Sequence, residues 1–329
     1  MTLTKDSDIL SLTHTDLDGH GPEIVERSLG FNPKVVNLEN TRVDSYIEEL
    51  VTKILNGSKP APEYLFITDI APNEEVGKLV DLLHQSGKTE IHLFDHHPTA
   101  LHLNQYAWAN VIPEEDGVKQ CGTSLFYRFL KDVIKVEMTD ELRASLDIFV
   151  KEIQLYDTWA WEEQNHTSAK TLNDLFYLAG HKEFNKTQIQ KIQCHDTALF
   201  SPEEERLLAV EDRRIEKYLK DKKEDMVIIS DFFTDENGKP WVAGVVQADR
   251  YNSELGHSLC KEYPEIDFAL LLDLTHDKAS LRAVKEDVDL TIIAKRYEGG
   301  GHPPAAGCKI TPMGMEFLQK VFMKVSEKE

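Results

Sequence analysis

The stretch Ile91-His92-Leu93-Phe94-Asp95-His96-His97-Pro98 joins an apolar run to one carboxylate and two imidazoles. The apolar run predicts a buried strand, which Pro98 ends because proline has no backbone N–H for the next sheet hydrogen bond. Three ligand-type side chains at one strand end favour a bound divalent metal ion. A solvated turn with two histidines fits this stretch equally well, so the rest of the chain must separate the two interpretations.

Strand and helix patterns alternate around this stretch. Ile9–Thr13, residues 34–38 and Tyr64–Thr68 are predicted strands. Helical spacing follows the second and third of them, with Asn73 as a predicted N-terminal cap of the second helix. Such alternation is typical of an α/β domain with a mostly parallel sheet flanked by helices.

Ligand-type side chains recur where these strands end. His14, Asp16 and Asp18 follow the first strand, and Asp69 ends the third. On an extended backbone, residues two positions apart face the same side, so Asp16 and Asp18 are expected to share a cation. We expect Gly19 and Gly21 to turn the chain and Pro22 to open the next helix, although an Asp/Gly-rich surface loop fits the same string.

Because ligands of parallel sheets gather at the carboxyl ends of the strands, these groups are expected to meet Asp95, His96 and His97. Asp157 extends the apolar stripe of a helix that starts near residue 139 or 140. A buried acid needs a partner, so Asp157 fits the same metal site; an aspartate in a helix-ending turn is the alternative.

The composition sets limits on function. The chain has 329 residues, 41% of them hydrophobic, and a formal charge of -21. This length predicts two domains, and this charge argues against binding to duplex nucleic acid while allowing a small anionic substrate beside metal ions. The four cysteines are scattered, and neither a signal peptide nor a membrane-spanning run is evident, so we expect a cytoplasmic protein without membrane contact.

The second half has a different organisation. Residues 187–222 are polar and predicted to be a helical linker between a domain at 1–186 and a smaller α/β domain with a mixed sheet at 223–329. Residues 226–229, 241–246, 268–272 and 280–284 are its predicted strands, and residues 235–238 predict a hairpin turn. Its string Glu298-Gly299-Gly300-Gly301-His302 predicts a loop whose backbone N–H groups bind an anion, with Arg282 as a second phosphate contact. A flexible turn and a surface arginine are the alternatives.

Together these motifs resemble the DHH phosphoesterase family, named after the tripeptide at Asp95-His96-His97. Asp16-Leu17-Asp18-Gly19 is similar to its first motif, Asp69 to its second and Asp157 to its fourth. The string ending in His302 is similar to the signature of the DHH-associated C-terminal domain. The resemblance covers nearly the whole chain and implies a catalytic domain, a linker and a substrate-binding domain.

The resemblance implies a phosphoesterase with two divalent metal ions, most often Mn²⁺, with Mg²⁺ or Co²⁺ as alternatives, and attack by metal-activated hydroxide. The implied metal ligands are His14, Asp16, Asp18, Asp69, His96 and Asp157. His14 stands two residues before the first motif aspartate, whereas family members often have a histidine four residues before it. Asp95 is implied to orient His96, and His97 to face the substrate phosphate. Gly299, Gly300, Gly301 and His302 are implied to hold a phosphate from the second domain.

Within the family, the size and the acidic surface favour a nanoRNase B-like enzyme that cuts short, single-stranded, 5′-phosphorylated oligonucleotides to mononucleotides. A nucleotide bisphosphate such as 3′-phosphoadenosine 5′-phosphate is a candidate second substrate. The alternatives are a RecJ-like single-strand DNA exonuclease and a non-catalytic nucleotide-binding regulator, against which the intact ligand set argues. The oligomeric state does not follow from the sequence, and a homodimer is one candidate.

Overall fold

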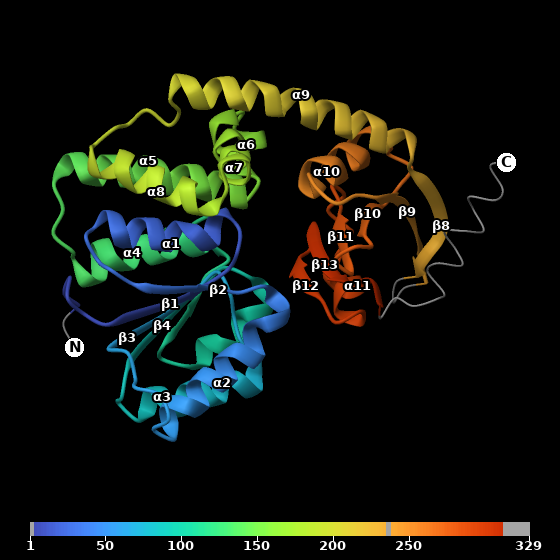
Figure 1. The fold of residues 1–329 in the computed structure, drawn as a ribbon. Coiled ribbons are helices and arrows are strands. Elements are labelled where there is room, and N and C mark those ends of the chain that lie inside the picture. The colour runs from blue at the N-terminus through green and yellow to red at the C-terminus, as the bar shows by residue number, and fades with distance from the viewer. Residues whose placement is uncertain (1–2, 235–237, 312–329) are drawn as a thin grey trace. The chain divides into compact units, whose positions relative to one another are not determined.

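The computed structural model describes residues 3–234 and 238–311. The chain forms two compact units, Met1–Ala209 and Val210–Glu329 (Figure 1). The helix α9 (Pro202–Glu224) contains the boundary between them. The limits predicted for the two domains and the linker stay predictions.

The first unit is built on a five-stranded sheet in which all neighbouring strands are parallel, as the alternating pattern predicts. Its order is β2-β1-β3-β4-β5. The strands are β1 (Ile9–Thr13), β2 (Lys34–Asn37), β3 (Tyr64–Thr68), β4 (Glu90–Asp95) and β5 (Ala109–Val111). All residues of β1 and β3 are buried, because helices cover both faces of the sheet.

Two apolar cores lie on the two faces of this sheet. One contains side chains of α2 (Val43–Leu55) and α3 (Glu74–Gln85). The other contains Leu208 of α9 and side chains of five further α-helices, some of which Figure 1 shows on the opposite side of the sheet. These helices are α1 (Leu17–Ser28), α4 (Gly122–Arg128), α5 (Asp140–Asp157), α7 (Thr167–Ala179) and α8 (His181–Gln193).

Short elements connect these helices and strands. They are η1 (Asn40–Arg42), η2 (Pro98–Gln105), β6 (Glu114–Glu115), β7 (Val118–Lys119), the π-helix η3 (Phe129–Ile134) and α6 (Ala160–Glu163). The predicted stop after β4 is confirmed, since Pro98 is the first residue of η2. The cap predicted for α3 is also confirmed, because Asn73 accepts a hydrogen bond from Val76 N at 3.0 Å.

The start of α1 differs from the prediction. The Asp16 side chain accepts a hydrogen bond from Gly19 N at 3.0 Å and caps the helix, so Asp18 lies inside α1 and not on an extended backbone. Pro22 is inside the helix as well, not at its first position. Gly19 does not form a turn; it allows close packing, because a Cβ atom there would lie 2.3 Å from His14 O. The argument that Asp16 and Asp18 face one side of a strand is therefore wrong.

The second unit contains a six-stranded mixed sheet of order β12-β13-β11-β10-β9-β8. Its strands are β8 (Val227–Thr234), β9 (Pro240–Gln247), β10 (Phe268–Asp273), β11 (Lys278–Arg282), β12 (Gly300–His302) and β13 (Ala305–Lys309). β9 and β10 are parallel, and the other neighbours are antiparallel. The helices α10 (Asn252–Glu262) and α11 (Thr291–Arg296) contribute to separate cores of this unit. Residues 235–237 of the predicted hairpin turn lie outside the described residues.

The glycine-rich string is not the loop that was predicted. Gly300, Gly301 and His302 form the edge strand β12, which pairs with β13. Gly301 has a φ of 134°, and a Cβ atom there would lie 2.6 Å from Ala305 O, so this strand requires glycine. In the described residues, no helix has the length and apolar character needed to cross a membrane.

Glu26 is a buried acid in the core between α1 and β1. It is 1% exposed, and its two carboxylate oxygens accept hydrogen bonds from Ser11 Oγ at 3.0 and 3.1 Å. Burial raises the pKa of Glu26 to about 8; Ser11 lowers it, Glu23 raises it and Arg27 lowers it, each by less than burial does. The folded chain therefore keeps this carboxyl protonated at pH values where the unfolded chain ionises it.

We expect Glu26→Gln to change how stability depends on pH. The wild-type unfolding free energy should fall as pH rises from 4.5 to about 8, because the folded state binds the Glu26 proton more tightly. Each pKa unit corresponds to about 1.4 kcal/mol. Between pH 5 and pH 8, the unfolding free energy of the variant should therefore rise by at least about that much relative to wild type. Chemical denaturation at both pH values measures this. Glu75→Gln, on the exposed face of α3, is the control, and an unchanged pH slope for Glu26→Gln would contradict the expectation.

Candidate metal centre

The carboxyl ends of three neighbouring strands bring imidazoles and carboxylates together in the first unit. His14 and Asp16 follow β1, Asp69 follows β3, and the DHH tripeptide begins with the last residue of β4. Asp69 has a left-handed backbone with φ 57°, which ends β3 within one residue; its N–H donates to Phe94 O at 2.9 Å. Asp18 on α1 and the last residue of α5, Asp157, add two further carboxylates.

One group of ligand atoms consists of His14, Asp16 and Asp69. The His14 Nδ1 atom lies 2.8 Å from Asp16 Oδ2 and 3.8 Å from Asp69 Oδ2. Ligand atoms of the three residues all lie within 4.8 Å of one another. This spacing fits one divalent cation bound by an imidazole and two carboxylates.

A second group surrounds His96. Its Nε2 atom lies 3.3 Å from Asp69 Oδ1, 3.4 Å from Asp157 Oδ2 and 4.0 Å from Asp18 Oδ2. Ligand atoms of Asp18, His96 and Asp157 also lie within 4.8 Å of one another. Asp69 therefore links the two groups: its Oδ2 lies near His14, and its Oδ1 lies near His96.

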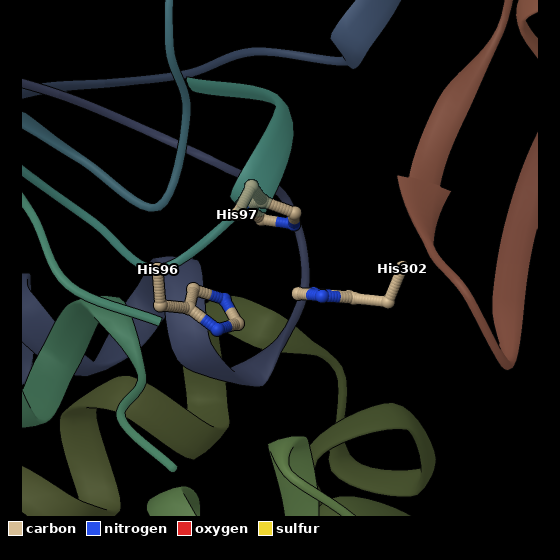
Figure 2. Close-up of side chains that lie close together, drawn as sticks. All are labelled: His96, His97 and His302. Carbon is tan, nitrogen blue, oxygen red and sulfur yellow. The ribbon is translucent and has the colours of Figure 1, made fainter. Parts of the chain in front are cut away.

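Asp95 lies beneath the two histidines and is fully buried. Its Oδ1 accepts hydrogen bonds from His96 N at 2.9 Å and from His97 Nδ1 at 2.7 Å. The rings of His96 and His97 lie 4.4 Å apart between centroids (Figure 2). Asp95 thus contacts the backbone of His96 and the ring of His97, whereas the family resemblance implied that it orients His96.

Burial and electrostatic repulsion act together in this cluster. Burial, followed by the charges of Asp18 and Asp16, raises the pKa of both Asp69 and Asp157 well above the usual range. Burial also raises the pKa of Asp16, but the adjacent His14 and the Gly19 N–H outweigh it and leave that pKa far below its usual value. The charge and the hydrogen bond of His97 outweigh burial at Asp95 and lower its pKa. A cation among these carboxylates would relieve the repulsion at Asp69 and Asp157.

The residues fit such a cation. Asp69 Oδ2 and Asp157 Oδ2 are buried and accept no hydrogen bond from any residue that the structure describes. A buried acceptor without a donor is costly, and a metal ion removes that cost. Carboxylates and imidazoles without a thiolate ligand are typical of Mn²⁺ or Mg²⁺ sites rather than of structural zinc sites.

The remaining predicted site residues belong to the second unit. His302 lies on β12, as Figure 2 shows, and pairs in register with Ala305, which pairs with Arg282. Directly paired residues point to the same face of a sheet, so His302 and Arg282 share one face. The Arg282 guanidinium donates to Leu281 O at 2.8 Å and to Ser253 Oγ at 3.0 Å, so it is partly engaged within this unit.

Gly122 and Thr123, at the start of α4, were not among the predicted site residues. Their backbone N–H groups donate to the Asp18 carboxylate at 2.6 and 2.9 Å. In the structure, Cys121 and Ser124 form a capping box at this helix start, although the string Cys-Gly-Thr-Ser lacks the usual Ser/Thr and Glu/Gln of that motif. Nothing in the local sequence predicts that this start would meet a residue 104 positions earlier.

Comparison with known proteins adds to this geometry. No family model matches the chain. Oligoribonuclease NrnB from Bacillus subtilis (strain 168) is 40% identical over 307 residues, which are 91% of this chain and 72% of that protein.

Two solved structures are similar at lower identity. One is a pGpG-specific phosphodiesterase, PggH, from Vibrio cholerae, with 12% identity, a TM-score of 0.49 and coverage of 98% of both chains. The other is an uncharacterized protein from Helicobacter pylori G27, with 18% identity, a TM-score of 0.45 and coverage of 97% of this chain and 98% of that one.

We expect Asp157→Asn to have opposite effects with and without metal. In the presence of a chelator, the variant should melt at a higher temperature than wild type, because one buried, mutually repelling carboxyl is gone. With Mn²⁺ added, it should gain less stability and bind the ion at least about tenfold more weakly, as loss of a metal ligand implies. Melting curves and metal titration measure both effects. The exposed Asp132→Asn is the control, and an unchanged metal-induced shift in Asp157→Asn would exclude Asp157 as a ligand.

Proposed function

Because the chain belongs to the DHH phosphoesterase family, we propose that it is a two-metal phosphodiesterase that hydrolyses short, 5′-phosphorylated oligoribonucleotides to mononucleotides. One observation carries this proposal: a protein named oligoribonuclease is 40% identical over 91% of the chain. The two ligand groups that meet at Asp69 support the two-metal part of the proposal.

We propose that His14, Asp16 and Asp69 hold one divalent ion, and that Asp18, His96 and Asp157 hold the other, with Asp69 contributing to both. Mn²⁺ is the proposed ion, and Mg²⁺ and Co²⁺ are the alternatives to test. Two such ions would supply activation of water and neutralisation of the negative charge that develops on a phosphodiester during in-line displacement.

His97 is the proposed contact to the scissile phosphate. Its Nδ1 donates to Asp95 Oδ1 at 2.7 Å, which fixes the orientation of the ring. The His97 side chain is 30% exposed, whereas that of His96 is 6% exposed. This difference supports a substrate role for His97 and a metal role for His96.

The negative net charge of the chain supports a short substrate. A formal charge of -21 repels a long polyanion, whereas a substrate of a few nucleotides needs only local positive charge at its phosphates. Metal ions would supply that charge in the first unit. In the second unit, the backbone of Gly299, Gly300 and Gly301 together with His302 and Arg282 is the proposed phosphate contact.

The decisive test is a substrate panel with purified protein and Mn²⁺. We expect mononucleotides from 5′-phosphorylated di- to pentaribonucleotides and no turnover of long single-stranded DNA. Asp69→Ala should reduce the rate by at least about a thousandfold, because it removes the carboxylate that contacts both ligand groups. Asp132→Asn should keep the wild-type rate. Degradation of long DNA with the short ribonucleotides left intact would exclude the proposed substrate class.

A second test separates substrate binding from metal binding. His302→Ala should raise KM for a diribonucleotide by about tenfold or more while the metal content stays at the wild-type level, because His302 is proposed to contact phosphate. Metal analysis and steady-state kinetics measure the two effects. His276→Ala, whose side chain is 71% exposed in the same unit, should change neither. A large loss of metal in His302→Ala would instead make His302 a metal ligand.

A further inference from the structure

The start of α4 forms three hydrogen bonds with Asp18. Gly122 N donates to Asp18 Oδ2 at 2.6 Å, and Thr123 N donates to Asp18 Oδ1 at 2.9 Å. Thr123 Oγ1 donates to the backbone carbonyl of Asp18 at 2.7 Å. Asp18 is 2% exposed and Thr123 is fully buried, so water does not compete for these bonds.

This contact depends on close backbone packing. A Cβ atom at Gly122 would lie 2.7 Å from Asp69 Cβ and 2.9 Å from Asp69 N, so the start of α4 also lies against the residue that contacts both ligand groups. On α1, a Cβ atom at Gly21 would lie 2.1 Å from Thr123 Oγ1 and 2.7 Å from Thr123 Cγ2. The Thr123 side chain therefore fills the space that Gly21 leaves open.

Asp18 is an influential charge in the cluster. Its Oδ2 lies 4.0 Å from His96 Nε2, and ligand atoms of Asp18, His96 and Asp157 all lie within 4.8 Å of one another. Each of its oxygens accepts one backbone N–H and keeps a second lone pair for a cation. The position of this carboxylate therefore sets both the repulsion that its neighbours experience and the geometry that a cation meets.

We propose that Gly122 and Thr123 are positioning residues that fix Asp18 for the cation bound by Asp18, His96 and Asp157. Binding of the other cation, at His14, Asp16 and Asp69, should depend on Gly122 and Thr123 much less. His14 and Asp16 are held by other contacts: Gly19 N donates to Asp16 Oδ1 at 3.0 Å, and Asn37 Nδ2 donates to the His14 carbonyl at 2.8 Å. The proposal rests on the metal site of the proposed function, and it concerns which residues support one of its two halves.

The first experiment replaces Thr123 without changing its size. Thr123→Val removes the hydroxyl, and we expect one of two Mn²⁺ ions to bind roughly 10–100-fold more weakly, as loss of a residue that orients metal ligands does. Thr123→Ser keeps the hydroxyl and should bind within about threefold of wild type. Isothermal titration of the metal-free protein with Mn²⁺ alone measures both sites, and electron paramagnetic resonance reports whether the two ions remain coupled.

The second experiment is a double-mutant cycle across the packing of α1 on α4. Gly21→Ala should push Thr123 away from Asp18 and weaken the same site, although Gly21 itself binds nothing. The Gly21→Ala/Thr123→Ala protein removes both Thr123 contacts and leaves the end of the Ile153 side chain, with Cδ1 at 2.9 Å, to shift slightly. It should return to the affinity of Thr123→Ala alone, a non-additivity expected for residues in contact. Gly77→Ala is the control, because its Cβ would meet Leu103 Cδ2 at 2.8 Å in the other core and should leave both affinities unchanged.

The outcomes separate this proposal from the proposed function. If wild-type protein binds two ions and Thr123→Val binds both as tightly as wild type does, the positioning role alone is overturned. Equal weakening of both ions would overturn its selectivity for the Asp18 half. Wild-type protein that binds no divalent ion would overturn the metal site itself. If Gly21→Ala does not fold, the Thr123→Val and Thr123→Ser pair still decides.

Discussion

Repulsion between carboxylates at the ends of parallel strands is the constraint on which the first unit depends. Burial, and then the charges of other aspartates, raise the pKa of Asp69 and of Asp157. One oxygen of each of these side chains is buried without a hydrogen-bond donor among the described residues. A packed interior tolerates this arrangement when the carboxyls are protonated or when positive charge is supplied close by. The proposed divalent ions would supply that charge, with His14 and His96 beside the carboxylates as further ligands.

The sheet determines where these groups meet. Strands β1, β3 and β4 are adjacent and parallel, so residues that follow them in sequence reach the same edge. The pattern of apolar runs and caps predicted that these residues meet at one edge, because their meeting depends only on local residue spacing and on a general rule of parallel sheets. The position of Asp157 followed from helical periodicity in the same way, since it continues the buried stripe of α5.

Other parts of the site depend on contacts that local patterns do not encode. Asp16 caps α1, so the extended backbone ends at Asp16 and does not continue to Asp18 as their parity suggested; competition between the two local structures decided the outcome. The bonds from Gly122 and Thr123 to Asp18 join segments 104 and 105 residues apart. Likewise, the glycine-rich string became a strand because β13 offered it a partner, which overrides the turn preference of glycine.

The strand β12 also bears on how the second unit behaves in a crowded solution. It is the edge of its sheet, and an edge strand exposes backbone groups that can recruit a strand from another molecule. β12 has three residues, two of them glycines, and Pro303-Pro304 follows it directly. A foreign strand would find little length to pair with and no side chains on the glycines to pack against. The backbone that is proposed to contact phosphate is therefore too short to template aggregation.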